Sequence, residues 1–259
     1  MAETRIWATR PEEQNAEWRK SLEALGRKVI DLPLLAIEPV QEPEEIQAIK
    51  NHILDFDQFD KVFFVSQNAV REAFNWLHNY WPQLPLGVEY LAVGSKTAEA
   101  VRAEGVPVVA GETSMDTEEI LDLPQMQNVA GQKILICRGK GGYPRMGEIL
   151  QSRGATVRYC ELYHRRLPAE AAAKAAPLLA AGCAADVVPL FSGETVQNYI
   201  QVLEANRVSE RGMVLVVPGK RVLQAAESAG FSRVVAVENA TLPVMFAGVQ
   251  EALRSIGAP

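Results

Sequence analysis

Short apolar segments alternate along this chain with stretches whose apolar residues recur at helical spacing. KVFFVS (61–66), KILIC (133–137) and MVLVVPG (213–219) are examples of the first kind, and residues 67–81 and 96–105 are examples of the second. Strands that are apolar along nearly their whole length and separated by helices are typical of parallel sheets covered on both faces. The chain is therefore predicted to be an α/β protein.

The second half of the chain repeats the first. Residues 5–34 align with residues 133–162, and VFFVSQNAV aligns with VPLFSGETV, which pairs Ser66 with Ser192. The identities in the first alignment include Arg10/Arg138, Gly26/Gly154 and Leu34/Leu162. A repeat of about 126 residues is far longer than the roughly 20–50 residues of a solenoid unit. The repeat therefore predicts two similar α/β domains that arose by internal duplication.

Two stretches with proline, LPLLAIEP (32–39) and YHRRLP (163–168), lie at matching places in the two halves. Because proline disfavours helix in the residue before it, both are predicted to be extended crossovers that form a two-stranded β-bridge. One domain is then discontinuous, residues 1–35 plus 168–259, and the other is continuous, residues 38–165.

Two local predictions accompany this organisation. PVVAG (107–111) is expected to be a strand, because it is apolar and β-branched. AEAAAKAAPLLAAG (169–182) is expected to be an Ala-rich helix, interrupted or restarted near Pro177.

Composition excludes several classes of protein. The 259 residues have a net charge of −6 and a pI near 5.3, which argues against a broad nucleic-acid surface. No apolar run reaches the roughly 18 residues that cross a bilayer, and the N-terminus is charged where a signal peptide is apolar. Three widely spaced cysteines and three histidines predict buried thiols and no metal site. We expect a soluble, cytoplasmic monomer that binds neither nucleic acid nor membrane.

Small residues, hydroxyls and cations follow the predicted strands, where an open parallel sheet binds its ligands. The candidate substrate-binding residues among them are Thr9, Arg10, Ser66, Asn68, Gly94, Lys96, Thr97, Arg138, Gly139, Gly141, Gly142, Ser192, Gly193, Thr195, Gly219 and Lys220. Any one hydroxyl among them is also explained as a helix cap, and the cations as solvated surface charges. As a set, these residues predict a site for a ligand with several negative charges.

The segment RGKGGYPRMGE (138–148) has the glycines of a nucleotide-binding loop but not their spacing. Pro144 stands where a dinucleotide fingerprint needs its third glycine, and Glu148 stands where a P-loop needs lysine. Gly141 and Gly142 still allow the backbone to approach an anionic group closely.

Tyr163 ends a predicted strand beside three basic residues. Its phenol is a candidate catalytic group in a cleft between the domains, and a packed strand aromatic is the alternative interpretation. The sequence contains no Ser/His/Asp triad or paired-carboxylate pattern, so an enzyme of this kind would act mainly by holding and shaping its substrate.

The chain resembles bacterial uroporphyrinogen-III synthases along nearly its whole length. The likeness is carried by Thr9-Arg10, F-x-S-x-N-A-V from Phe64 to Val70, V-G-x-x-T-A from Val93 to Ala98, R-G-x-G-G from Arg138 to Gly142, L-x-x-R-G-A-x-V from Leu150 to Val157, and Y-x-R from Tyr163 to Arg165. The resemblance implies two α/β domains joined by a two-stranded β-bridge, with the active site in the cleft between them.

The resemblance also implies a lyase of haem, sirohaem and cobalamin biosynthesis. The family cyclises hydroxymethylbilane, a linear tetrapyrrole with eight carboxylates, to uroporphyrinogen III, with loss of water and inversion of ring D. No cofactor is required. A transient contact with hydroxymethylbilane synthase, which makes the substrate, is a further expectation.

Carried over residue by residue, Tyr163 matches the family tyrosine proposed to assist departure of the hydroxyl group. The matching cleft positions are Thr9, Ser66, Asn68, Thr97, Arg138, Gly139, Ser192 and Gly219. The chain departs from the family pattern where Tyr143 follows R-G-x-G-G in place of arginine, with Arg145 two residues later. In the second half, Val222 stands at the place of Thr97, so that hydroxyl is absent.

Two other functions are weighed against this one. A non-enzymatic clamshell module that binds a small polyanion has similar architecture, although such modules are usually exported. A descendant of the enzyme that kept the fold and lost turnover is the second alternative.

Overall fold

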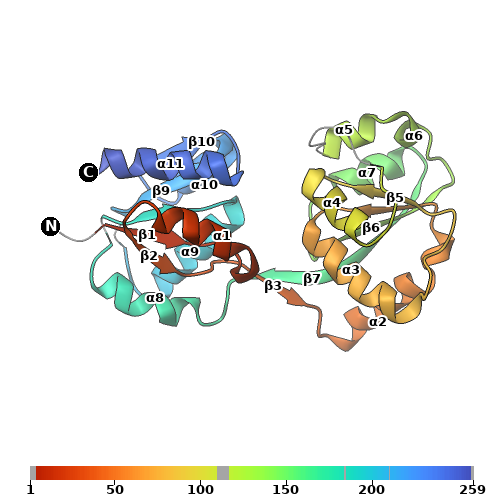
Figure 1. Cartoon of the computed structure of the whole chain (residues 1–259), viewed down its shortest axis with the longest axis horizontal. Coiled ribbons are helices and arrows are strands. Elements are labelled where there is room, and N and C mark those ends of the chain that lie inside the picture. Colours follow the sequence, from red (N-terminus) through yellow and green to blue (C-terminus); the bar gives the residue numbers. More distant parts are fainter. Residues whose placement is uncertain (1–3, 110–116, 184, 210, 258–259) are drawn as a thin grey trace. The chain divides into compact units, whose positions relative to one another are not determined.

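The computed structural model describes residues 4–109, 117–183, 185–209 and 211–257. The described residues form two compact units, which divide the chain into Met1–Ala36 with Arg166–Pro259 (unit 1) and Ile37–Arg165 (unit 2). Figure 1 labels most of the helices and strands of both units. None of the helices in the described ranges has both the length and the apolar character needed to cross a membrane.

Unit 1 has a five-stranded sheet in the order β10-β9-β8-β1-β2, in which neighbouring strands are parallel. Its strands are β1 (Arg5–Ala8), β2 (Lys28–Asp31), β8 (Val187–Pro189), β9 (Val214–Pro218) and β10 (Val234–Val237). Its helices are α1 (Glu12–Glu23), α8 (Ala171–Ala180), α9 (Gly193–Ala205), α10 (Gly219–Ser228) and α11 (Leu242–Ser255). Helices α1 and α11 cover one face of the sheet, and α8, α9 and α10 cover the other.

Unit 2 has a five-stranded sheet in the order β3-β7-β6-β4-β5. Its strands are β3 (Ala36–Pro39), β4 (Lys61–Phe64), β5 (Glu89–Ala92), β6 (Lys133–Gly139) and β7 (Thr156–Arg166). Its helices are α2 (Pro43–Leu54), the short 3-10 helix η1 (Phe56–Gln58), α3 (Gln67–Tyr80), α4 (Ser95–Ala103), α5 (Thr117–Asp122), α6 (Pro124–Gln127) and α7 (Arg145–Ser152). Strands β4, β5, β6 and β7 run parallel.

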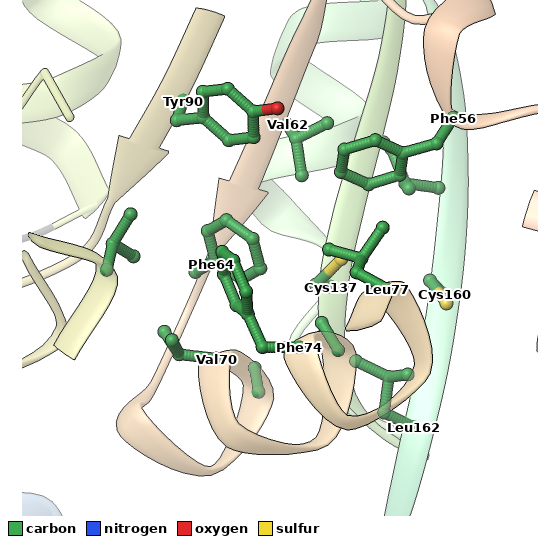
Figure 2. Packing of buried hydrophobic residues seen from close by; sticks show 14 of the residues in the cluster. Phe56, Val62, Phe64, Val70, Phe74, Leu77, Tyr90, Cys137, Cys160 and Leu162 are labelled. Carbon is green, nitrogen blue, oxygen red and sulfur yellow. The ribbon is translucent and has the colours of Figure 1, made fainter. Parts of the chain in front are cut away.

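Strand alternation divides the core of unit 2 into two layers. On β6, Ile134 and Ile136 pack with α5, α6 and α7, whereas Leu135 and Cys137 pack with α2, α3 and α4. Figure 2 shows the second layer, in which Phe74 of α3 packs among the strand side chains. The predicted class, two α/β units with sheets covered on both faces, is confirmed.

The two extended crossovers become β3 and β7, which are hydrogen-bonded neighbours in the sheet. The strand predicted at 107–111 is reduced to a single parallel bridge between Val109 and Leu91, and residues 110 and 111 lie outside the described ranges. Pro107 lacks the N–H that a longer ladder would need.

The predicted break near Pro177 is wrong, because α8 runs through the proline. Ala171, Ala175 and Leu179 are buried at four-residue spacing, and their packing holds the helix together on both sides of Pro177. Pro177 and Ala173 lie on the exposed side, so the Ala173 carbonyl, which the proline cannot bond, is accessible to water.

Candidate functional site

A pocket opens at the edge of the unit 2 sheet where the parallel strands end. It has a volume of about 220 Å³. The lining residues are Val65, Ser66, Ile136, Arg138, Gly139, Gly142, Tyr143, Met146, Tyr159, Tyr163 and Arg165. Five of the residues predicted from sequence lie there together: Ser66, Arg138, Gly139, Gly142 and Tyr163.

A pair of hydroxyl groups forms one part of this pocket. Ser66 is the N-cap of α3, and its Oγ accepts a hydrogen bond from the Ala69 N–H at 3.1 Å. The same Oγ lies 2.9 Å from the phenolic oxygen of Tyr163. Because the Ser66 oxygen already accepts the capping bond, its own hydroxyl hydrogen is free to point at Tyr163. In that arrangement the Tyr163 proton is available to a ligand in the pocket.

The Tyr163 ring packs so closely against Gly139 that only glycine fits at this position. A Cβ at Gly139 would lie 2.6 Å from Cε2 of Tyr163, so a larger residue would displace the ring. The register of β6 and β7 shifts between Arg138 and Gly139, which brings Gly139 opposite Tyr163. The Lys140 N–H then donates to the Tyr163 carbonyl at 2.8 Å. Gly139, a predicted substrate-binding residue, thus leaves room for the Tyr163 ring.

Arg138 is held at the other side of the pocket by three contacts. Its guanidinium lies over the Tyr159 ring, 3.8 Å from the centroid. It donates to the Gly142 carbonyl at 2.9 Å and to the Glu161 carboxylate at 2.9 Å. Sequence reasoning missed Tyr159 and Glu161, which precede Tyr163 on the strand TVRYCELY.

Tyr143 and Arg165 complete the polar part of the pocket. The Tyr143 side chain is 78% exposed, an unusual state for a large aromatic residue, and it lies in the loop between β6 and α7. Tyr143 stands where the family pattern has arginine, so an aromatic ring borders this pocket at that position. Arg145, the first residue of α7, is not part of the pocket lining.

One group of described residues has the donor types of a metal site. The ligand atoms of Glu42, Glu45 and His164 lie within 4.8 Å of one another. They already pair among themselves and with Lys140, which forms an ion pair with Glu45. Hydrogen bonds from its own backbone and then from His164 lower the pKa of Glu42 to about 2. We interpret the group as an ion-pair cluster that fixes the start of α2 beside β7.

The other predicted residues of unit 2 lie outside the lining of this pocket. They are Asn68, Gly94, Lys96, Thr97 and Gly141. Gly94 precedes α4 with a φ of +82°, a conformation that favours glycine. Lys96 is exposed, whereas Thr97 is buried.

In unit 1, several predicted residues make contacts that stabilise the fold. The Thr9 hydroxyl is buried and donates to the Pro189 carbonyl. Ser192 and Thr195 form a capping box at the start of α9, which also contains Gly193. Gly219 begins α10 with a φ of +68°, and Lys220 beside it is exposed.

Arg10 is the unit 1 candidate with the most distinctive environment. It lies 4.9 Å from the centroid of the Phe191 ring and donates to Gln14 at 2.7 Å. Burial lowers the pKa of its guanidinium from the ordinary value. Since a desolvated cation gains from a nearby negative charge, the site favours an anionic ligand.

Comparison with known proteins places the chain in a family. The family model described as uroporphyrinogen-III synthase HemD matches residues 16–247. The chain belongs to the uroporphyrinogen-III synthase family. This confirms the family resemblance identified from the sequence motifs.

Individual relatives agree. The uroporphyrinogen-III synthase of Escherichia coli (strain K12) is 34% identical over 164 residues, which span 62% of this chain and 64% of that protein. The chain therefore matches somewhat less than two thirds of that relative's length. The synthase of Synechococcus elongatus is 30% identical over 207 residues, 78% of this chain and 75% of that protein.

Solved structures support the fold. A mutant uroporphyrinogen III synthase from Thermus thermophilus superposes with a TM-score of 0.63 at 17% identity and covers 98% of this chain and 100% of its own. The enzyme from Helicobacter pylori 26695 gives a TM-score of 0.64 at 14% identity, with 96% and 99% covered. Uroporphyrinogen-III synthases are enzymes of haem biosynthesis. The hydroxyl pair in the unit 2 pocket is therefore a candidate for the catalytic group.

Proposed function

We propose that this chain is an active uroporphyrinogen-III synthase. It would act as a lyase on hydroxymethylbilane, remove the terminal hydroxyl group as water, invert ring D and close the macrocycle. Family membership supports the proposal, since the family model matches residues 16–247. We further propose that units 1 and 2 are its two domains and that it works as a cytoplasmic monomer, with hydroxymethylbilane synthase as a transient partner.

The observation that carries the proposal is the Ser66–Tyr163 hydroxyl pair, 2.9 Å apart, in a pocket with Arg138. When Ser66 donates to the phenolic oxygen, Tyr163 can give its proton to the departing hydroxyl group. The carbon–oxygen bond then breaks, water leaves, and the substrate carries the positive charge as an azafulvene. A positioned proton donor of this kind typically contributes about 10²–10⁴-fold to a rate.

The size and charge of the pocket fit one part of a long anionic substrate. Its volume of about 220 Å³ is smaller than the roughly 300–1,000 Å³ of pockets that hold an entire drug-sized ligand. We propose that it takes one pyrrole ring with its carboxylates, beside Arg138 and Arg165. The remaining carboxylates would bind other strand-end groups, among which Arg10 and Lys220 of unit 1 are the cationic candidates.

The decisive experiment supplies hydroxymethylbilane, made in situ by its synthase, without added cofactor. The type I and type III uroporphyrin isomers are then resolved after oxidation. Type III product that depends on this protein supports the proposal. Type I product alone, from folded protein, contradicts it and favours the non-enzymatic binding module.

A further inference from the structure

The Glu161 carboxylate occupies a position suited to an anionic ligand. Its Oε1 accepts hydrogen bonds from Nη2 of Arg138 at 2.9 Å and from the backbone N–H of Gly141 at 3.2 Å. A guanidinium and a backbone N–H of a glycine-rich loop, converging on one oxygen, form a typical carboxylate site. Gly141 has a φ of +69°, so the loop needs glycine there to present this N–H.

Glu161 also lies beside the pocket, because it contacts Arg138, one of the lining residues. Glu161 stands on β7 between Tyr159 and Tyr163, next to the register shift of the β6–β7 pair. Tyr159 and Tyr163 line the pocket on either side of it. The Glu161 side chain is 33% exposed, which leaves it accessible to solvent. A negative charge therefore stands where the proposed substrate would place its own carboxylates.

The duplicated unit shows that this fold does not need a carboxylate to hold the arginine. In the alignment of residues 5–34 with 133–162, Arg10 corresponds to Arg138 and Pro33 corresponds to Glu161. Arg10 lies against Phe191 and bonds to Gln14 without an ion pair among the described residues. A carboxylate such as Glu161 is therefore not needed to hold the arginine in this fold.

We propose that Glu161 is an internal substitute for a substrate carboxylate. In the ligand-free protein it satisfies Arg138 and the Gly141 N–H, and an acetate or propionate group of the substrate replaces it there. Because the Glu161 side chain is already partly exposed, water solvates its carboxylate when a substrate carboxylate replaces it at Arg138. This inference rests on the proposed function for the identity of the substrate, but the carboxylate site is testable without turnover.

The kinetic test is Glu161→Gln. Glutamine keeps an oxygen that accepts from Arg138 and Gly141, and it removes the competing charge. We expect KM to fall about three- to tenfold with kcat unchanged. If Glu161 only held the loop in shape, KM would be unchanged or would rise, and the proposal would be wrong. Glu148→Gln, an exposed carboxylate on α7, is the matched control and should leave KM within about twofold.

The binding test uses acetate as a probe and the Gly141 amide resonance of ¹⁵N-labelled protein as the readout. We expect acetate to shift this resonance in the wild-type protein and to do so at about three- to tenfold lower concentration in Glu161→Gln. No shift in the wild-type protein overturns the proposal, even if the variant is unstable. An acetate response in a protein that makes no type III product would refute the proposed function and leave the carboxylate site supported.

Discussion

The two units place a serine at the start of equivalent helices but use its hydroxyl differently. Ser66 and Ser192 have nearly the same backbone conformation and cap α3 and α9. In unit 1, the Ser192 cap is reciprocal, because Oγ1 of Thr195 accepts from the Ser192 N–H at 3.0 Å. In unit 2, alanine stands at the corresponding position, and Ser66 Oγ contacts Tyr163 instead. The serine therefore stabilises only the helix start in unit 1, whereas in unit 2 it also contacts the Tyr163 hydroxyl.

The strand that supplies the tyrosine differs in the same way. If the alignment of residues 5–34 with 133–162 is continued by one position, Leu35 corresponds to Tyr163. Leu35 is buried and apolar, so unit 1 has no phenol at this place. Duplication supplied two similar scaffolds, and a few side chains at the strand ends give them different chemistry.

The largest expected effect is on the stability of unit 1. The carboxylate of Asp186 accepts from Nε and Nη2 of Arg5, at 2.8 and 2.7 Å, and from the Trp7 indole at 2.8 Å. Arg5 and Asp186 are both buried. Asp186→Asn leaves a buried cation without its counter-charge, and we expect a loss of about 3–5 kcal/mol in the free energy of unfolding, measured in urea.

The control for Asp186 is the ion pair Lys61–Glu89 of unit 2. The Glu89 side chain is 31% exposed, so water replaces part of what Glu89→Gln removes. We expect a clearly smaller loss than for Asp186→Asn. Equal losses in the free energy of unfolding would show that the burial of the Arg5–Asp186 pair does not make it more important for stability than the Lys61–Glu89 pair.

The next largest effect is on turnover in unit 2. Tyr163→Phe removes the proposed proton donor and keeps the ring that packs on Gly139. We expect kcat to fall about 100-fold with little change in the unfolding temperature. Tyr90→Phe is the matched control, because the Tyr90 hydroxyl is buried without a hydrogen-bond partner. A normal kcat for Tyr163→Phe would remove this tyrosine from the mechanism.

The two serines give a direct comparison of scaffold and chemistry. Ser66→Ala and Ser192→Ala each remove an N-cap, and both should lower the free energy of unfolding by about 1 kcal/mol. Only Ser66→Ala should also lower kcat, about tenfold if the lost bond is worth about 1.4 kcal/mol. The readouts are urea unfolding and initial rates. Equal effects of the two variants on kcat would mean that Ser66 acts as a helix cap alone.

Much of the fold was predictable because it depends on local patterns. Apolar strand segments such as KILIC and the repeat of residues 5–34 at 133–162 gave the α/β class and the duplication. Pro177 misled the helix prediction, because the buried spacing of Ala171, Ala175 and Leu179 outweighs the lost hydrogen bond.

The site residues at the strand ends could be predicted from the sequence, but the residues that contact them could not. Ser66, Arg138 and Tyr163 follow from their places in the sequence pattern. Glu161 did not, because its contact with Arg138 depends on which residues of β6 and β7 stand opposite each other. That register includes a shift at Arg138 and Gly139, which no local pattern in the sequence reports.

The smallest predicted effect concerns the ion-pair cluster at the start of α2. The pKa of Glu42 is lowered to about 2 in the folded protein from an ordinary value of 4.5. Its stabilising contribution is therefore fully present above about pH 4.5 and is lost as the pH falls toward 2. We expect the unfolding temperature of the wild-type protein to fall more steeply across this range than that of Glu42→Gln. The control is Glu44→Gln, which removes the same charge at an exposed neighbour, and its unfolding temperature should fall with pH as steeply as that of the wild type. If the pH profile of Glu42→Gln ran parallel to that of the wild type, the contact of Glu42 with His164 would have no stabilising role.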